Sequence, residues 1–93
     1  MMYRIRSTKA YRKAYARVSK HKNFDSGRLG EIIDTLASGE KLSAKYHDHQ
    51  LSGELQDYRE CHVKDDLLLQ YQTQENVLVL LLVDLGTHDD LFR

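Results

Sequence analysis

The feature that most constrains the fold is an uninterrupted apolar run over residues 77 to 83. A strand that is apolar on both faces has to be covered on both, so this stretch, extended to residue 85, predicts a central strand. Residues 57 to 63 alternate between polar and apolar, and residues 66 to 72 are apolar at every second position. The breaks between these segments are short enough for hairpin turns, which predicts an antiparallel meander of three strands.

The N-terminal part of the chain predicts a short strand followed by an amphipathic helix. Tyr3 and Ile5 alternate with arginines, which is a strand signal, and Ser7 or Thr8 can then cap a helix. Apolar residues in that helix recur at i, i+3, i+4 and i+7 and form one stripe, with basic residues mostly on the other side. The stripe consists of Tyr11, Ala14, Tyr15 and Val18.

A second helix with the same spacing is expected to begin at Asp25 or Ser26 and to stop at Gly39. Residues 40 to 56 show no sustained period, and a loop of this length is often functional. The fold class is therefore α+β, with an N-terminal strand and a helical hairpin packed on a small antiparallel sheet. Residues 1 to 93 are expected to form a single domain.

The formal charge of zero conceals two opposite parts of the chain. Residues 1 to 28 hold nine Lys and Arg against one acidic residue, whereas residues 29 to 93 hold five against thirteen. Such a split suggests a basic face that contacts phosphates, although a solvated basic helix near acidic loops would give the same tally.

Composition and the N-terminal sequence indicate a globular protein of the cytoplasm. With 41% hydrophobic and 30% charged residues, the chain differs from disordered and membrane proteins. The longest apolar run is too short to span a bilayer, and arginines alternate where a signal peptide would need an apolar block. The single cysteine, Cys61, cannot form an internal disulfide, which fits a reducing compartment.

The meander predicts that histidines and one carboxylate gather at one edge of the sheet. His62 closes one strand and Asp66 opens the next, so the turn between them brings the two together. His88 follows the third strand, and Asp66 and the end of that strand lie at similar distances from the second hairpin turn. The irregular segment that holds His49 can fold over the same edge.

Three histidines near a carboxylate suit acid–base chemistry, because an unperturbed histidine titrates at about 6.5. RNA is the natural substrate for such a set. A base removes the proton of the 2′-hydroxyl, which attacks the adjacent phosphate, and an acid protonates the 5′-oxygen that leaves. DNA lacks the 2′-hydroxyl, so this route discriminates against it. The scheme needs no cofactor and no metal.

Other interpretations stay open on spacing alone. Scattered histidines in a small protein mostly lie on the surface, and Asp66 would then simply end a turn. A zinc site would use His47 and His49 with His62 or Asp66, but no recurrent ligand spacing supports it. Phe92 would either stack on a nucleobase or plug the core.

Four segments in the second half of the chain carry a family resemblance. They are Asp48-His49-Gln50-Leu51-Ser52-Gly53, Tyr58-Arg59-Glu60-Cys61-His62-Val63, Asp66 with Leu69-Gln70-Tyr71, and Gly86-Thr87-His88 with Leu91-Phe92. Together they resemble the YafQ branch of the RelE/ParE toxin superfamily. The order of strand, helical hairpin and meander also follows that family, so the resemblance covers almost the whole chain. It implies a RelE-like fold of the microbial-RNase type.

The resemblance implies a ribosome-dependent mRNA interferase, an endoribonuclease that enters the A site of the 70S ribosome and cleaves the codon there. The residues that match the family's catalytic motifs are His49, His62, Asp66 and His88. We expect His88 to be the general acid. His49 or His62 would take the 2′-hydroxyl proton, and Asp66 would orient or charge a neighbouring histidine. Phe92 matches the family's terminal aromatic residue and, with Arg59, is expected to bind substrate.

The basic residues of the first helix are expected to contact ribosomal RNA phosphates rather than to perform chemistry. They are Lys9, Arg12, Lys13, Arg17 and Lys20. The resemblance also implies a cognate antitoxin that wraps the catalytic face, with a toxin–antitoxin heterotetramer as one form of the complex. The alternatives are a ParE-like gyrase inhibitor of the same fold and a non-catalytic RNA-binding module, and neither of them needs an acid–base set.

Overall fold

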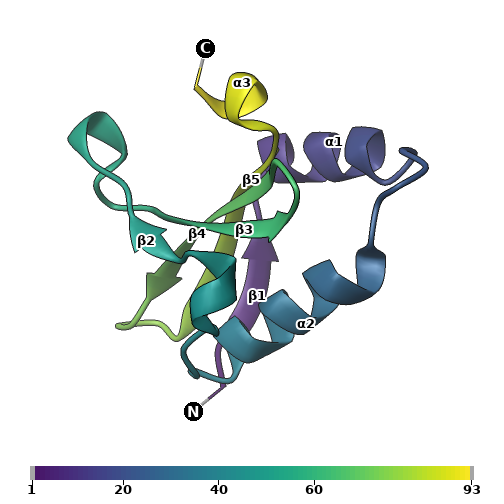
Figure 1. Cartoon of the computed structure of the whole chain (residues 1–93). Helices are drawn as coiled ribbons and strands as arrows, with labels where there is room; N and C mark the ends of the chain where they lie inside the picture. Colours follow the sequence, from purple (N-terminus) through teal and green to yellow (C-terminus); the bar gives the residue numbers. More distant parts are fainter. Residues whose placement is uncertain (1, 93) are drawn as a thin grey trace.

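The apolar strand β5 (Val79–Gly86) lies inside a five-stranded sheet of order β1-β5-β4-β3-β2, as its two apolar faces require (Figure 1). It pairs antiparallel with β4 (Leu67–Gln74), which pairs antiparallel with β3 (Arg59–Lys64), so the predicted meander is confirmed. The N-terminal strand β1 (Arg4–Ser7) runs parallel to β5 along its other side. The sheet is therefore mixed rather than purely antiparallel. The computed structural model describes residues 2 to 92.

Two helices cover one face of this sheet and share one hydrophobic cluster with it. α1 (Lys9–Val18) begins after Thr8, whose hydroxyl accepts a hydrogen bond from the Tyr11 amide at 3.0 Å, and it packs mainly on β5. α2 (Ser26–Ala37) begins after Asp25, whose carboxylate caps its first turn, and it packs mainly on β3. Figure 1 shows the two helices spread apart over the sheet. The two helices cover different strands, because the apolar stripe of α1 packs on β5 and that of α2 packs on β3.

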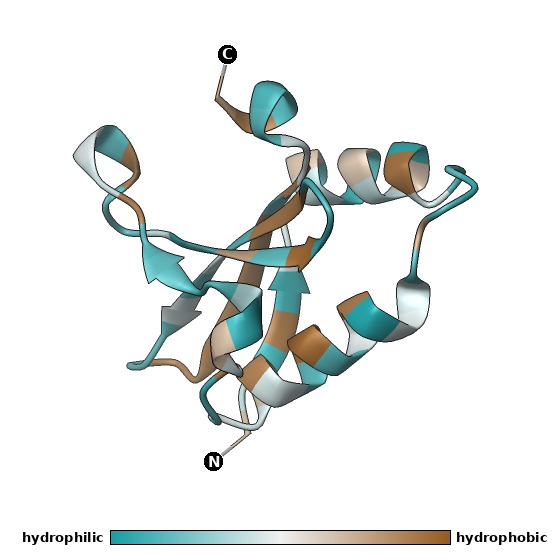
Figure 2. Cartoon of the chain, in the orientation of Figure 1, coloured by the Kyte–Doolittle hydropathy of each residue, from teal (hydrophilic) through white to brown (hydrophobic). Residues whose placement is uncertain are grey.

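The core lies between the helices and the sheet. The apolar stripes of both helices are largely buried, as predicted, but Tyr15 remains 39% exposed and packs edge-on against Phe24, with ring centroids 5.7 Å apart. The strands contribute Cys61, Val63, Leu69, Tyr71, Leu80, Leu82 and Leu85. Figure 2 shows hydrophobic residues along the central strands and a hydrophilic β2. Each large aliphatic side chain buried here stabilises the fold by about 1.5–3 kcal/mol.

The segment without a sequence period, residues 40 to 56, holds two short 3₁₀ helices and a strand that the sequence did not predict. η1 (Ala44–Tyr46) ends at His47, which adopts a left-handed φ of 50°. β2 (His49–Gln50) then pairs antiparallel with β3, and η2 (Gly53–Leu55) leads back toward that strand. His49 and Gln50 are both polar, so they show no alternation of polar and apolar residues that would predict a strand. They form one because the outer edge of β3 offers backbone hydrogen-bonding partners.

A short C-terminal helix, α3 (His88–Leu91), follows β5 and was also not predicted. The Thr87 hydroxyl accepts a hydrogen bond from the Asp90 amide, and the Asp90 carboxylate accepts one from the Thr87 amide, which completes a capping box. Gly86 permits this close turn, since a Cβ there would lie 2.9 Å from the Cβ of Asp90. Arg17 of α1 pairs with Asp90 at 3.4 Å and ties the two helices together. Among residues 2 to 92, every helix is too short or too polar to cross a membrane.

Candidate active site

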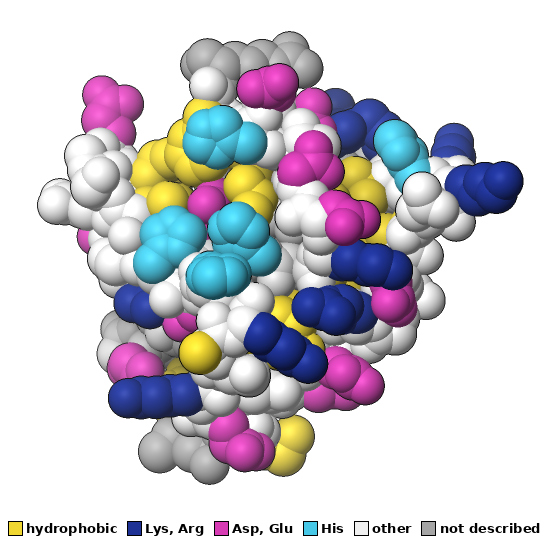
Figure 3. Space-filling model, viewed as in Figure 1, with side chains coloured by type: hydrophobic (Ala, Val, Ile, Leu, Met, Phe, Trp, Pro, Cys, Tyr) yellow, Lys and Arg dark blue, Asp and Glu magenta, His cyan; other side chains and the backbone are white. Residues whose placement is uncertain are grey.

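The face of the sheet opposite the helices carries the polar residues of the meander. Neighbouring residues of a strand point to opposite faces, so Glu60 and His62 point away from the helices while Cys61 and Val63 enter the core. Gln70 lies opposite Glu60 on β4 and shares its face. Figure 3 shows histidine side chains gathered on one face of the molecule, with acidic side chains and apolar surface between them. Proton-transfer groups are thus displayed together.

Glu60 is a buried carboxylate on this face that the sequence analysis did not single out. It is only 4% exposed, and its Oε2 accepts a hydrogen bond from Nε2 of Gln70 at 3.3 Å. Its Oε1 lies 3.5 Å from Nε2 of His49. The sequence feature that could have pointed to Glu60 is its spacing of two residues from His62, because residues i and i+2 of a strand lie on the same face.

His49 is held by acceptors at both ring nitrogens. Its Nδ1 lies 2.7 Å from the carbonyl oxygen of His47, and its Nε2 faces Glu60. A carbonyl oxygen only accepts, so the Nδ1 atom carries a proton. Its Nε2 lies within ion-pair distance of the Glu60 carboxylate, 3.5 Å away. The two contacts fix the orientation of the ring on the sheet.

His62 packs against a histidine that the sequence analysis considered only as a zinc ligand. The ring centroids of His47 and His62 lie 5.3 Å apart at an interplanar angle of 62°. The left-handed backbone of His47 brings its ring to His62 and its carbonyl to His49. Thus one exposed residue contacts two of the expected catalytic histidines.

His88 and Phe92 stand at the end of the sheet, on α3. The strand register aligns His62 with Leu68 and Leu68 with Gly86, so these three residues form one row across the sheet. His88 comes two residues after Gly86 along the chain. The rings of His88 and Phe92 pack at 4.8 Å, and both side chains are exposed. The structure therefore brings His49, His62 and His88 to one face, with an aromatic surface beside His88.

Asp66 does not make the expected polar contact with His49, His62 or His88. It is exposed in the turn between β3 and β4, and within the described residues no hydrogen bond or ion pair joins it to a histidine. It lines a separate cleft together with Thr87. The expected orienting contact from Asp66 is not present in this arrangement, and Glu60 holds the position of the carboxylate partner.

Arg59 forms hydrogen bonds that hold the loop around β2 in place. Its Nη2 donates to Asp48 at 3.0 Å and its Nη1 to Gln50 at 3.2 Å, while the hydroxyl of Tyr71 donates to the same aspartate. The hydrogen bond to Asp48 raises the pKa of Arg59, and burial raises the pKa of Tyr71. Because Arg59 precedes Glu60 on the strand, it points to the other face. It fixes the loop before His49, and its expected role in substrate binding stays a prediction.

The expected RNA-contacting residues lie on α1 and in the turn after it, and all are exposed: Lys9, Arg12, Lys13, Arg17 and Lys20. Two of them also have partners, since Arg12 donates to the Ser7 carbonyl at 2.6 Å and Arg17 pairs with Asp90. Three lysines leave their ammonium groups to solvent, which keeps them available to phosphates.

The remaining reactive groups do not form a second centre. Burial raises the pKa of the Cys61 thiol to about 12, so it is not a nucleophile near neutral pH. Across the part of the chain that the structure describes, no group of three or more His, Cys, Asp or Glu side chains is arranged to hold a metal ion. The zinc-site alternative thus lacks a ligand set within these residues.

Comparison with known proteins places these features in a family context. Residues 3–93 match the family described as bacterial toxin of type II toxin-antitoxin system, YafQ. A putative YafQ toxin of Haemophilus influenzae is 52% identical over 40 residues, a stretch that spans 43% of this chain and 39% of that relative. A metal-bound toxin from Helicobacter pylori is 41% identical with a TM-score of 0.89 and covers 99% of this chain and 100% of its own. YafQ in the E. coli DinJ–YafQ toxin-antitoxin complex is 29% identical with a TM-score of 0.87, covering 100% of both chains.

Proposed function

The chain belongs to the YafQ family of bacterial type II toxins, and from this we propose that it is an endoribonuclease that cleaves mRNA in the ribosomal A site. The observation that carries the proposal is the set of His49, His62 and His88 on the open face of the sheet, with Glu60 buried beside His49. Such groups transfer protons and stabilise charge near neutral pH. The proposed reaction needs no cofactor.

In the proposed reaction His62 takes the proton of the 2′-hydroxyl, whose oxygen then attacks the adjacent phosphorus. The bond from phosphorus to the 5′-oxygen breaks, and His88 donates a proton to that oxygen. His49, protonated and paired with Glu60, stabilises the negative charge of the phosphorane. The products are a 2′,3′-cyclic phosphate and a 5′-hydroxyl end.

The stacked pair of His88 and Phe92 supports the assignment of the leaving-group side. Thr87 and Asp90 fix the first turn of α3, so the imidazole is presented from a capped helix rather than from a free tail. Phe92 offers an aromatic face on which a base next to the scissile phosphate would stack. A stacked base would bring the 5′-oxygen within reach of His88.

The proposal includes two partners and a location. E. coli YafQ forms a complex with its antitoxin DinJ, which supports a cognate antitoxin as a partner of this chain. We propose that this antitoxin covers the face that carries the histidines. The ribosome would be held through RNA phosphates by the exposed lysines of α1. A ribosomal target implies action in the cytoplasm, and a heterotetramer is the assembly that we propose for the silenced state.

Primer extension on a defined message in purified translating 70S ribosomes tests the proposal. We expect the wild-type chain to cut within A-site codons, and His62→Ala and His88→Ala each to lose on the order of 100-fold or more of the cleavage rate. Glu31→Ala, on the exposed side of α2, serves as the matched control and should cleave normally. A message that stays intact with wild-type protein, together with arrested gyrase supercoiling, would establish the gyrase-inhibitor alternative instead.

A further inference from the structure

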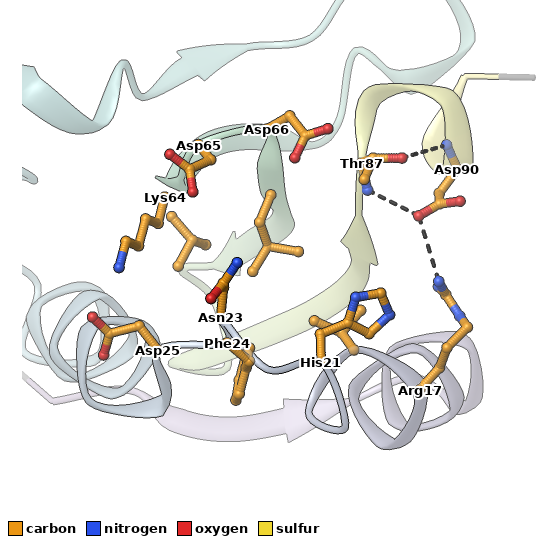
Figure 4. A pocket seen from close by; sticks show the side chains of 13 residues that line it. Arg17, His21, Asn23, Phe24, Asp25, Lys64, Asp65, Asp66, Thr87 and Asp90 are labelled. Carbon is orange, nitrogen blue, oxygen red and sulfur yellow. Dashed lines mark hydrogen bonds and ion pairs between the residues drawn. The ribbon is translucent and has the colours of Figure 1, made fainter.

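A cleft of about 240 Å³ lies next to the candidate active site and plays no part in the proposed reaction. It opens between the end of α1, the connection to α2, the turn from β3 to β4, and the start of α3 (Figure 4). Asp66 and Thr87 belong to its rim, and His88 directly follows Thr87. An RNA strand at the reacting edge would therefore pass the mouth of this cleft.

The floor of the cleft is apolar. Its lining includes Val18, Val63 and Leu67 together with the ring of Phe24. Val18 and Val63 are buried in the core, and Phe24 is held edge-on by Tyr15. The floor thus offers a firm non-polar surface against which a flat ring can pack.

The rim carries hydrogen-bonding groups aimed across this floor. Figure 4 shows Asn23 reaching from the connection between α1 and α2 toward the turn where Asp65 and Asp66 lie. Within the described residues neither of these two carboxylates takes part in a hydrogen bond or ion pair. Arg17 and Asp90, also on the rim, neutralise each other. Acceptors without partners therefore dominate one side of the cleft.

Size and charge together select the class of ligand. The lining holds four aspartates, Asp25, Asp65, Asp66 and Asp90, against Arg17, Lys64 and His21, and this negative balance disfavours a phosphate inside the cleft. Pockets for drug-sized ligands measure about 300–1,000 Å³, so this smaller cleft fits a single planar ring rather than a whole nucleotide. Base amino groups donate to carboxylates, as cytosine does to Asp and Glu in nucleic-acid complexes.

We propose that this cleft binds one unpaired nucleobase that carries an exocyclic amino group, from the RNA strand held at the candidate active site. The ring packs on Phe24 and Leu67, and the amino group donates to Asp65 or Asp66. The phosphates on its two sides lie at the mouth of the cleft, within reach of Lys64 in the lining and of the cationic face of α1. This inference rests on the proposed function and gives Asp66 a role in base binding instead of the expected contact with His49, His62 or His88.

Nuclear magnetic resonance titration of the full chain with 2′-O-methyl trinucleotides tests the cleft separately from cleavage, because these RNAs cannot be cut by 2′-hydroxyl attack. We expect amide shifts at residues 23, 24 and 64 to 67. Trinucleotides of adenine or cytosine should bind about tenfold more tightly than that of uracil, because the carbonyl edge of uracil offers no amino donor.

Substitutions test which side chains cause the preference for bases that carry an amino group. Asp65→Asn together with Asp66→Asn should abolish the preference for amino-bearing bases, and Phe24→Leu should weaken all three trinucleotides. Asp57→Asn, an exposed aspartate outside the cleft, is the matched control and should bind like wild type. Circular dichroism melting of each variant establishes that it is folded.

Three results would overturn the proposal. One is equal binding of all three trinucleotides with shifts confined to the histidine face, and another is no shift at the cleft residues at millimolar RNA. Shifts at the cleft with butylammonium or guanidinium, but not with RNA, would point to a basic side chain of a protein partner. In each case the ribosome assay decides the proposed function independently.

Discussion

Nε2 of His49 lies 3.5 Å from Oε1 of Glu60, a carboxylate that is only 4% exposed and that also holds the side chain of Gln70. The pair joins the two-residue strand β2 to β3 across a register that aligns these same two residues. The buried carboxylate thus lies within ion-pair distance of an exposed imidazole. This relationship explains why an otherwise irregular loop presents a histidine at a fixed place on the sheet.

Glu60→Gln should lower message cleavage on the order of 100-fold while the protein stays folded. The amide keeps the shape of the side chain and can still bond Gln70, but it removes the negative charge opposite His49. Primer extension in translating ribosomes measures the effect. Glu54→Gln, an exposed glutamate of η2, is the matched control, and equal activity of the two variants would show that His49 acts without its carboxylate partner.

His47→Asn should lower cleavage by about tenfold through misplacement of His62 and should leave thermal stability nearly unchanged. Asparagine tolerates the left-handed φ of 50° and retains the carbonyl that holds His49, so only the ring contact with His62 is lost. His47→Phe retains an aromatic ring and should restore most of the activity. Single-turnover rates on ribosomes provide the readout. Because a phenylalanine is strained at this φ, its melting temperature is measured as well, and a folded phenylalanine variant that fails to rescue would show that the imidazole itself is required.

Gly86→Ala should lower the rate of message cleavage strongly while it lowers the free energy of unfolding only slightly. The added methyl group would meet Asp90 at 2.9 Å and push α3 outward, which displaces His88 and loosens the capping box. Gly30→Ala is the matched control, since no atom lies within 4 Å of its new methyl group, and it should raise stability by about 0.5–1 kcal/mol. Urea unfolding and primer extension on both variants separate the two effects. A Gly86→Ala protein with full activity would show that α3 adjusts without moving His88.

Stability should fall as pH rises from about 9 to beyond 12. Burial raises the pKa of Cys61 from 9.0 to about 12 and that of Tyr11 from 10.0 to about 12, and burial also raises that of Tyr71. A raised folded-state pKa contributes stability that is complete below the unfolded value and is lost as pH rises through the folded one. Urea midpoints between pH 8 and pH 12 measure this loss. Tyr71→Phe should flatten the decline, and an unchanged slope would show that Tyr71 does not ionise on unfolding.

Much of the fold could be predicted because its signals are local. The stripe of α1, the caps at Thr8 and Asp25, and the two-faced apolar run of β5 each occupy a few neighbouring residues. The exposed Tyr15 shows the limit of this reasoning, since helical spacing places it on the apolar stripe while Phe24 offers it a surface contact instead.

The candidate site was predicted in outline and differs in its partners. The family motif pointed to His49, His62 and His88, and the structure brings them to one face. The motif also suggested Asp66 as their carboxylate and Arg59 as a substrate contact, yet Glu60 meets His49 and Arg59 holds Asp48. Alternation along β3 decides both outcomes, because residues 59 and 60 must point to opposite faces.

By itself the sequence determined α1, α2, the meander and the residue types available for acid–base chemistry, since these depend on periodicity and capping within short stretches. Only the tertiary structure decided that His49 would pair with Glu60, that His47 would support His62, and that a cleft would open beside Asp66. The first two contacts depend on how the polar segment that holds His47 and His49 docks on the edge of β3. The cleft depends on how α1, α2 and α3 approach the turn between β3 and β4. Such approaches are set by packing between distant segments, which no local pattern encodes.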